Sequence, residues 1–267
     1  MKNKKRKCEI ITIANRKGGV AKTFTTFTIG TGLALLGYKV LLIDLDSQSN
    51  LTYNLNIDSV KGTMYDVITG ALCIDDVIVN GDLCDVVCGG AELSAVDITI
   101  TGPGREYKLK EAIEPLKDKY DFIFIDTPPA LDLLTVNALT ATDSVIIPAQ
   151  ADIHSIQGII MLNDMIDTLK KYTNPNIYIK GILITRYDKR AILNKDMKAN
   201  IEELAKTINT KVFKTPIREN VTVKEAQATK ESIFIYSKNS NGAKDYKAVI
   251  DELLNDKGVE QNEQEKL

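Results

Sequence analysis

Histidine and closely spaced cysteine are almost missing from this sequence, and their scarcity argues against a structural metal centre. The only histidine is His154, and no C-x-x-C pair is formed by the four cysteines, which are Cys8, Cys73, Cys84 and Cys88. A zinc site needs about four nitrogen or sulfur ligands at close spacing. We therefore expect the cysteines to be buried, reduced thiols of a cytoplasmic protein.

Long apolar runs and a large net charge are missing as well. No apolar stretch is long enough to span a bilayer, and the basic N-terminus lacks the apolar segment of a signal peptide. The net charge is only −2, so any binding of a polyanion must come from local patches. The 267 residues, 44% of them apolar, are enough to bury a sizeable core. The composition predicts a globular protein of the cytoplasm with no membrane partner.

One glycine-bearing stretch, from Ala14 to Thr23, lies between an apolar run and a long helical pattern. A strand, a loop, Lys-Thr and a helix in this order are typical of a site that binds nucleotide phosphates with backbone N–H groups and a helix N-terminus. Lys22 would reach the β- and γ-phosphates, and the Thr23 hydroxyl would hold Mg²⁺. The stretch lacks both glycines of the pattern G-x-x-x-x-G-K-[ST], because Arg16 and Ala21 occupy their positions.

Acidic residues follow two other apolar strand patterns. The first, Tyr38 to Leu45, leads to Asp44 and Asp46, and the second ends at Asp126 before Thr-Pro-Pro. Ligands of open α/β sheets bind outside the carboxyl ends of the strands, so these acids should lie near the glycine-bearing loop. Asp126 resembles the end of a Walker B strand, which directs its carboxylate at the Mg²⁺ shell. Capping of the next helix is the alternative for one of the first two acids, and turn formation is the alternative for Asp126.

Strand and helix patterns alternate along the whole chain without a domain boundary. We predict an α/β fold, a single P-loop NTPase domain whose mostly parallel, twisted sheet carries helices on both faces. Residues 8–254 form this domain, 1–7 a basic tail that is either solvated or in contact with nucleic-acid phosphates, and 255–267 a polar, disordered tail. Further local predictions are a helix over Tyr107–Tyr120, a short strand over Lys211–Phe213, an extended segment over Ser232–Tyr236 and a last helix over Gly242–Leu254.

Six stretches occur in a characteristic order. They are K-G-G-V-A-K-T at 17–23, L-I-D-L-D-S-Q-S-N at 42–50, D-T-P-P at 126–129, P-A-Q-A-D at 148–152, I-R-E-N-V-T-V-K-E-A at 217–226 and S-N-G-A-K-D-Y at 240–246. Together they resemble the ParA/Soj ATPases of plasmid and chromosome partitioning, which share a deviant Walker A loop with MinD. The resemblance extends over roughly residues 8–254.

The resemblance implies a slow, partner-stimulated ATPase in which two ATP molecules are held between two protomers. Lys17 would reach across the dimer interface to the partner's nucleotide, where the triphosphate needs added positive charge. The catalytic residues would be Lys17, Lys22, Asp126 and Asp46, the last of which positions the attacking water. Thr23, Asp44 and Asp126 would support Mg²⁺. The implied ATP contacts are Lys17, Gly18, Gly19, Val20, Ala21, Lys22, Thr23, Phe24, Arg186, Ile217, Arg218 and Asn220.

The resemblance also implies two macromolecular partners. The ATP-bound dimer would bind double-stranded DNA without sequence preference, and a ParB-like centromere-binding protein would stimulate hydrolysis and release the DNA. Because the loop starts at residue 17, an N-terminal helix-turn-helix and specific operator binding are not expected. The candidate DNA contacts lie in the most lysine-rich part of the folded chain and are Lys189, Arg190, Lys195, Lys198, Lys224, Lys230, Lys238, Lys244 and Lys247.

Four residues depart from the family pattern. Glu219 and Asn241 occupy positions where the family has a basic residue, which affects the DNA contacts. A Cβ at Ala21 would crowd the phosphates, or add strain of about 1 kcal/mol if the backbone there is left-handed. Phe24 replaces the usual threonine and removes a hydroxyl contact to the α-phosphate. Nucleotide affinity is therefore the property most expected to deviate.

Other functions on the same scaffold stay open. One is a MinD-like regulatory ATPase that does not act on DNA, although the acidic, apolar-poor segment 255–267 is unlike a helix that docks on lipid. A small-molecule ligase or kinase is a second, and a nucleotide-binding scaffold with negligible turnover is a third. An iron–sulfur protein is disfavoured, because no cysteine follows Asp126.

Overall fold

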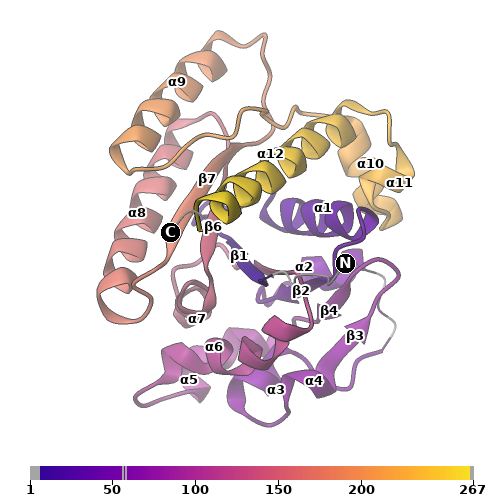
Figure 1. The fold of residues 1–267 in the computed structure, drawn as a ribbon, viewed down its shortest axis with the longest axis vertical. Coiled ribbons are helices and arrows are strands. Elements are labelled where there is room, and N and C mark those ends of the chain that lie inside the picture. Colours follow the sequence, from indigo (N-terminus) through magenta and orange to yellow (C-terminus); the bar gives the residue numbers. More distant parts are fainter. Residues whose placement is uncertain (1–6, 56, 58, 265–267) are drawn as a thin grey trace.

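The computed structural model describes residues 7–55, 57 and 59–264, which fold around one seven-stranded sheet (Figure 1). The strand order is β3-β4-β2-β5-β1-β6-β7, with β3 antiparallel to β4 and the other neighbours parallel. The predicted mostly parallel sheet is confirmed. The strands are β1 Glu9–Ile13, β2 Val40–Asp44, β3 Ile78–Asn80, β4 Asp85–Val87, β5 Phe122–Asp126, β6 Ser144–Ala149 and β7 Tyr178–Ile184.

Helices follow most of the strands and cover both faces of the sheet, as predicted. Within the described ranges, no helix is long and apolar enough to cross a membrane. The α-helices are α1 Lys22–Leu35, α2 Asn50–Asn54, α3 Met64–Thr69, α4 Ile74–Val77, α5 Val96–Thr99, α6 Lys108–Ile113, α7 Leu133–Ala141, α8 Ile153–Tyr172, α9 Ile192–Thr207, α10 Val221–Thr229, α11 Ile233–Tyr236 and α12 Asn241–Gln264, and the 3₁₀ helices are η1 Ala91–Ala95, η2 Arg105–Tyr107 and η3 Glu114–Asp118.

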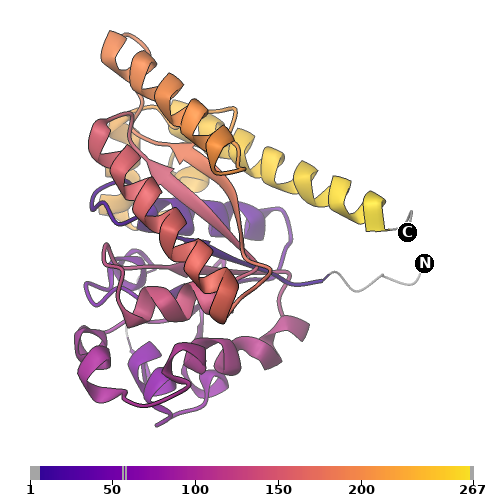
Figure 2. The same ribbon diagram turned by 90° about the vertical axis from the view of Figure 1, so that its left-hand side faces the viewer.

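Alternate residues of the central strands pack on opposite faces of the sheet, because side-chain direction reverses at each step along a strand. Ile11 and Ile13 of β1 belong to a core shared with α1 and α12, whereas Ile10 packs with α3, α6 and α7. A third cluster joins β6 and β7 to α8 and α9. Figure 1 shows α12 lying next to α1, and Figure 2 shows its last turns extending beyond the sheet.

Three predictions about secondary structure were wrong or only partly right. The helix over Tyr107–Tyr120 is divided into η2, α6 and η3, because Pro115 has no N–H to continue the α-helical hydrogen bonds. Ser232–Tyr236 is not extended, since it forms α11 and bonds within itself, with Tyr236 N donating to Ser232 O at 2.9 Å. Lys211–Phe213 forms only an isolated bridge, from Val212 to Ile182, and no strand.

The C-terminal boundary also differs from the prediction. Helix α12 continues to Gln264, ten residues beyond the expected end at Leu254. Of the predicted basic tail, residues 1–6 lie outside the described residues, as do 265–267 at the other end.

The sheet topology places the predicted functional segments at one edge. Strands β2, β5 and β1 are consecutive neighbours, and Asp126 pairs with Asp44 on one side and with Ile13 on the other. The glycine-bearing loop leaves β1 directly after Ile13. The two acidic strand ends therefore lie beside the loop, as expected for the carboxyl edge of a parallel sheet.

Candidate nucleotide-binding site

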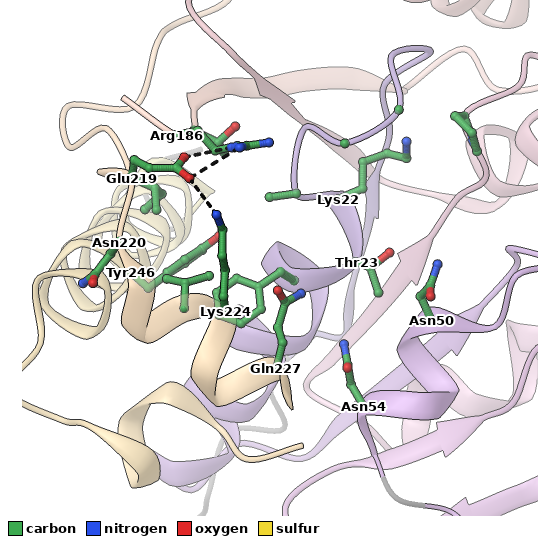
Figure 3. A pocket seen from close by; sticks show the side chains of 18 of the residues that line it. Lys22, Thr23, Asn50, Asn54, Arg186, Glu219, Asn220, Lys224, Gln227 and Tyr246 are labelled. Carbon is green, nitrogen blue, oxygen red and sulfur yellow. Dashed lines mark hydrogen bonds and ion pairs between the residues drawn. The ribbon is translucent and has the colours of Figure 1, made fainter. Parts of the chain in front are cut away.

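A pocket of about 500 Å³ opens at this edge, between the loop, helix α2 and helix α10 (Figure 3). It brings together residues as far apart in the sequence as Gly18 and Tyr246. The predicted site residues that line it are Gly18, Gly19, Ala21, Lys22, Thr23, Phe24, Asp46, Arg186, Ile217, Arg218 and Asn220. Four predicted residues do not line it, namely Lys17, Val20, Asp44 and Asp126.

Hydrogen bonds from the ends of β6 and β7 hold the loop in place. Asn15 Nδ2 donates to the carbonyl of Pro148 at 2.7 Å, and Asn15 Oδ1 accepts from the N–H of Lys17 at 2.9 Å. Gln150 Nε2 donates to the carbonyl of Gly19 at 3.0 Å, and the Thr185 hydroxyl donates to the carbonyl of Val20 at 3.1 Å. With these carbonyls engaged by neighbouring strands, the loop is preorganised before any ligand arrives.

Ala21 adopts the left-handed backbone conformation, which is one of the two effects predicted above for a residue with a Cβ at this position. Its φ is 67° and its ψ is 33°, directly before the first residue of α1, and its side chain makes no cap hydrogen bond. A non-glycine residue in this region carries strain of about 1 kcal/mol relative to glycine. The loop therefore keeps the geometry that glycine provides in the commoner pattern, at a cost in stability.

Replacing Ala21 with glycine should relieve this strain. We expect Ala21→Gly to raise the midpoint of thermal unfolding of the ligand-free protein by about 2–4 °C, the shift that about 1 kcal/mol produces in a domain of this size. Calorimetry or circular dichroism measures it. Ala199→Gly, at an exposed position in the middle of α9, is the matched control and should lower the midpoint. An Ala21→Gly midpoint at or below that of the parent would contradict the strain.

Lys22 and Thr23 begin α1 at the inner end of the pocket. Lys22 is 7% exposed, and its Nζ donates to the carbonyl of Lys17 at 3.3 Å. Burial lowers the pKa of Lys22, although the nearby carboxylates of Asp126 and Asp46 oppose the shift. The N-terminal amides of α1 carry no side-chain cap. A buried ammonium beside uncapped helix amides is an arrangement suited to an anion.

Asp126 has one carboxylate oxygen that the protein leaves unused. The residue is fully buried, Oδ1 accepts from the Thr26 hydroxyl at 3.3 Å, and among the described residues Oδ2 has no hydrogen-bond partner. Burial raises the pKa of Asp126 to about 8 and the negative charge of Asp44 adds to the shift, while the Thr23 hydroxyl beside the carboxylate and the charge of Lys22 oppose it. An unpartnered buried carboxylate oxygen next to Lys22 and Thr23 fits a site for a hydrated cation.

Protein side chains alone do not complete a metal site here. In the part of the chain that the structure describes, no group of three or more His, Cys, Asp or Glu side chains could hold a metal ion. Mg²⁺ retains waters and takes nucleotide phosphate oxygens as ligands in sites with few protein donors. The Thr23 hydroxyl and the free oxygen of Asp126 therefore fit a magnesium ion that arrives with a nucleotide.

Asp44 and Asp46 have different surroundings. Asp44 is fully buried, with Oδ2 accepting from both the N–H and the hydroxyl of Thr52 and Oδ1 accepting from the N–H of Asp46. Asp44 thus accepts hydrogen bonds from the first turn of α2, in line with the capping role predicted as the alternative for one of the two acids. Burial raises the pKa of Asp44 to about 6. Asp46 lines the pocket, and its Oδ1 accepts from the N–H of Gln48 at 3.0 Å. Of these two acids, Asp46 is therefore the one placed to contact a ligand in the pocket.

Lys17 is turned toward the end of β6 and the start of α8. Its Nζ forms an ion pair with Asp152 Oδ2 and donates to Gln150 Oε1 at 3.2 Å. Partial burial is the largest single influence on Asp152 and would raise its pKa. The hydrogen bonds from Lys17 and Ser155 and the charge of Lys17 together outweigh it, so the pKa of Asp152 is lowered. Asp152 Oδ1 also caps α8 by accepting from the N–H of Ser155 at 2.9 Å. In a single chain, the second loop lysine is occupied by the protein's own acceptors.

The opposite wall of the pocket is charged. Arg186, with a φ of 52°, donates to Glu219 through Nε at 2.8 Å and Nη2 at 3.4 Å, and Lys224 pairs with the same carboxylate at 3.6 Å (Figure 3). Arg218 is held by Asp245 of α12, with Nη2 to Oδ1 at 2.6 Å. Asn220 caps α10 through Oδ1. The glutamate that departs from the family pattern thus neutralises two cations beside the pocket.

The predicted DNA contacts are spread over α9, α10, α12 and the loops between them. Several carry ion pairs with acids close in sequence, such as Arg190 with Asp188 and Lys198 with Glu202. Lys224 lines the pocket, and the ammonium of Lys230 lies 3.9 Å from the centre of the Tyr53 ring. Among the described residues, no ion pair occupies Lys189, Lys195, Lys238 or Lys244.

Sequence reasoning missed several residues of the pocket and its rim. Gln150 and Asp152 belong to a stretch noted for its resemblance but received no role, and their position after a buried strand was the available signal. Tyr246, which ends the stretch at 240–246, also lines the pocket but received no role, and no local pattern singles out two further lining residues, Asn54 and Gln227. Their α-helices meet the loop only through the tertiary fold.

Comparisons with known proteins agree with this geometry. A family model described as an AAA domain matches residues 8–179. The sporulation initiation inhibitor protein Soj of Bacillus subtilis is 38% identical over 243 residues, which cover 89% of this chain and 95% of that protein.

Two solved structures share the fold and carry ligands. Cobyrinic acid a,c-diamide synthase from Mycobacterium smegmatis, with bound ADP and magnesium, has a TM-score of 0.80 at 31% identity and covers 92% of this chain and 94% of its own. A putative plasmid partition protein of Borrelia burgdorferi, bound to AMPPNP, has a TM-score of 0.79 at 28% identity, with 94% and 100% covered. The matching domain, the relatives over nearly the full length and the phosphate-binding loop lead to one conclusion: the chain belongs to the ParA/Soj family of P-loop ATPases.

Proposed function

We propose that this protein is a partitioning ATPase that positions a plasmid or chromosome. ATP with Mg²⁺ joins two protomers, the dimer binds double-stranded DNA without sequence preference, and a ParB-like partner stimulates hydrolysis, which releases the DNA. The protein then acts in the cytoplasm, on the nucleoid. The proposal extends the family assignment to a cycle of dimerisation and release.

The observation that carries this proposal is the direction of Lys17. The loop contains two lysines, of which only Lys22 lines its own pocket, while Lys17 pairs with Asp152 and Gln150 at the rim. A lysine that is not needed by its own nucleotide is available to the nucleotide of a second protomer. Its charge then stabilises the triphosphate only in the dimer, which makes ATP the signal for dimerisation.

The residues of one chain suffice to hold the nucleotide. Lys22 and the amides at the start of α1 bind the phosphates, and Ile217 with the neighbouring 218–220 segment forms the wall for the base. Thr23 and the free oxygen of Asp126 would hold Mg²⁺, which neutralises phosphate charge when it is bound. Asp46, at the pocket surface, positions the attacking water by accepting its hydrogen bond.

Binding of DNA should depend on nucleotide and on salt. We expect the protein to bind a random-sequence duplex with ATP and Mg²⁺ and to lose that binding steeply as salt rises, because lysine contacts to phosphate release counterions. Fluorescence anisotropy with ATP, ADP or no nucleotide, from low to high salt, measures this. Substitution of Lys189, Lys195, Lys238 and Lys244 by alanine should reduce the salt slope. Equal binding with ADP, or none with any duplex, would instead favour a scaffold or a small-molecule enzyme such as the M. smegmatis synthase.

A substitution at Asp126 should separate stability from ligand binding. The buried carboxyl has a pKa of about 8 in the folded chain and about 4 in the unfolded chain, so the stability it contributes falls as pH rises across this window. We expect Asp126→Asn, which does not titrate, to melt above the parent at pH 8 and close to it at pH 5 when no ligand is present.

The same variant should respond less to magnesium. We expect Mg²⁺ to raise the melting temperature of the ADP-bound parent strongly and that of ADP-bound Asp126→Asn only slightly. The reason is that the substitution replaces the unpartnered carboxylate oxygen with an NH₂ group or turns it away. Thermal shift with ADP, with and without Mg²⁺, measures this. Asp143→Asn is a control at the other end of the sheet, where Asp143 accepts from the N–H of Ile10. A variant that keeps the full magnesium response would remove Asp126 from the metal shell.

A further inference from the structure

Two amide side chains line one side of the pocket together. Asn54, on α2, and Gln227, on α10, come from helices that are far apart in the sequence. Figure 3 shows both amides turned into the pocket, below Thr23 in that view. Neither residue is part of the loop or of the segment after Ile217 that forms the far wall.

Asn54 is the more constrained of the two. It is 7% exposed, and within the described residues its side chain makes no hydrogen bond to any protein group. Its only open direction is the pocket. Its amide is not among the sealed, unsatisfied groups of the described residues, so water reaches it from the pocket and a ligand hydroxyl can take the place of that water. Gln227, half-buried on α10, likewise has no side-chain hydrogen bond in the described part of the chain.

Figure 3 shows Gln227 between Thr23 and Asn220, with Asn54 beside it, and this position identifies the part of the ligand that the amides meet. Lys22 and Thr23 fix the phosphate end, and the segment 217–220 forms the other end. The sugar of a nucleotide joins these ends. Phe24 and Tyr246, packed edge to face with ring centres 5.6 Å apart, add an apolar surface to the same region.

We propose that Asn54 and Gln227 bind the ribose hydroxyls and make the site selective for ribonucleotides. The inference rests on the proposed nucleotide function and adds two specificity-determining residues to it. A vicinal pair of hydroxyls donates and accepts, and a carboxamide offers both a donor and an acceptor. The 2′-hydroxyl takes the place of the water on the amide, and its removal leaves the amide without that partner.

Calorimetric titration of the full chain with ADP and 2′-deoxy-ADP, both with Mg²⁺, tests the proposal without interference from hydrolysis. The parent should bind ADP about fivefold to tenfold more tightly than the deoxy form, as expected for one hydrogen bond to a buried polar group. Asn54→Ala should bring this ratio close to one, because it should weaken the binding of ADP and leave the affinity for 2′-deoxy-ADP unchanged. Gln227→Ala, on the more exposed helix, should reduce the ratio as well.

Asn50→Ala is the matched control, because Asn50 is exposed, lies one turn earlier on α2 and lines the same pocket. Its ratio should equal that of the parent, and thermal melts should show that all three variants fold. A parent that binds both nucleotides equally, or an Asn54→Ala variant that keeps the parent ratio, would overturn the sugar contact while leaving the ATPase intact. Failure of the parent to bind any adenine nucleotide would overturn both proposals.

Discussion

Replacing Asp46 should leave nucleotide binding almost unchanged and slow hydrolysis by two orders of magnitude or more. The carboxylate lies at the pocket surface, whereas Asp44 and Asp126 are sealed beneath it. A side chain that orients or polarises the attacking water contributes about 10²–10⁴ to the rate. In the proposed complex ATP is held by Lys22, the amides of α1 and the far wall, and Asp46 acts on this set only through its charge near Lys22.

Two substitutions distinguish the role of Asp46 in positioning water from its role in the turn that it forms with Gln48. Asp46→Ala removes the carboxylate together with its hydrogen bond from the N–H of Gln48, whereas Asp46→Asn keeps an oxygen able to accept that bond. Both should lose phosphate release, measured with and without duplex DNA, while retaining ATP affinity by calorimetry. Gln48→Ala serves as a control at the same pocket wall. If Asp46→Asn releases phosphate at the parental rate, the acid only shapes the turn.

Removal of the Lys17 side chain should abolish dimerisation by ATP. In a symmetric dimer two lysine contacts are lost, each a charge-assisted bond worth about 1.5–3 kcal/mol, so the dimer dissociation constant should rise at least a hundredfold. Analytical ultracentrifugation with a non-hydrolysable ATP analogue and Mg²⁺ measures it. Affinity of the monomer for ADP should hardly change, because Lys17 does not line its own pocket.

Arg16→Ala is the matched control for this experiment. Arg16 is the preceding cation, is exposed, and contacts Met161 of α8 without any acidic partner among the described residues. Its loss should leave the dimer in place. A second variant, Asp152→Asn, weakens the contact that holds Lys17 in the single chain, so it should favour the dimer. Normal ATP-dependent dimers of Lys17→Ala would refute the exchange of lysines between protomers.

Much of the fold followed from local pattern. Buried parallel strands appear in the sequence as continuous apolar runs. A glycine-bearing loop followed by Lys-Thr predicts a helix directly after the first of these strands. The acids Asp46 and Asp126 were placed correctly at strand ends because parallel strands bring their carboxyl ends to one edge. The errors came where tertiary contacts override local preference, as in α11, which packs beside α1 and α12 and does not extend the sheet.

The sequence by itself determined the class of the protein: a parallel α/β sheet, a phosphate-binding loop and a second lysine within it. Only the tertiary structure decided that Ala21 is left-handed, that Lys17 is held by Asp152, that Glu219 pairs with Arg186, and that Asn54 and Gln227 share one pocket. Strands, helices and the loop arise from contacts between near neighbours, which a local pattern records. Partners more than thirty positions apart meet only when the sheet has closed, so their pairing leaves no periodic signal in the chain.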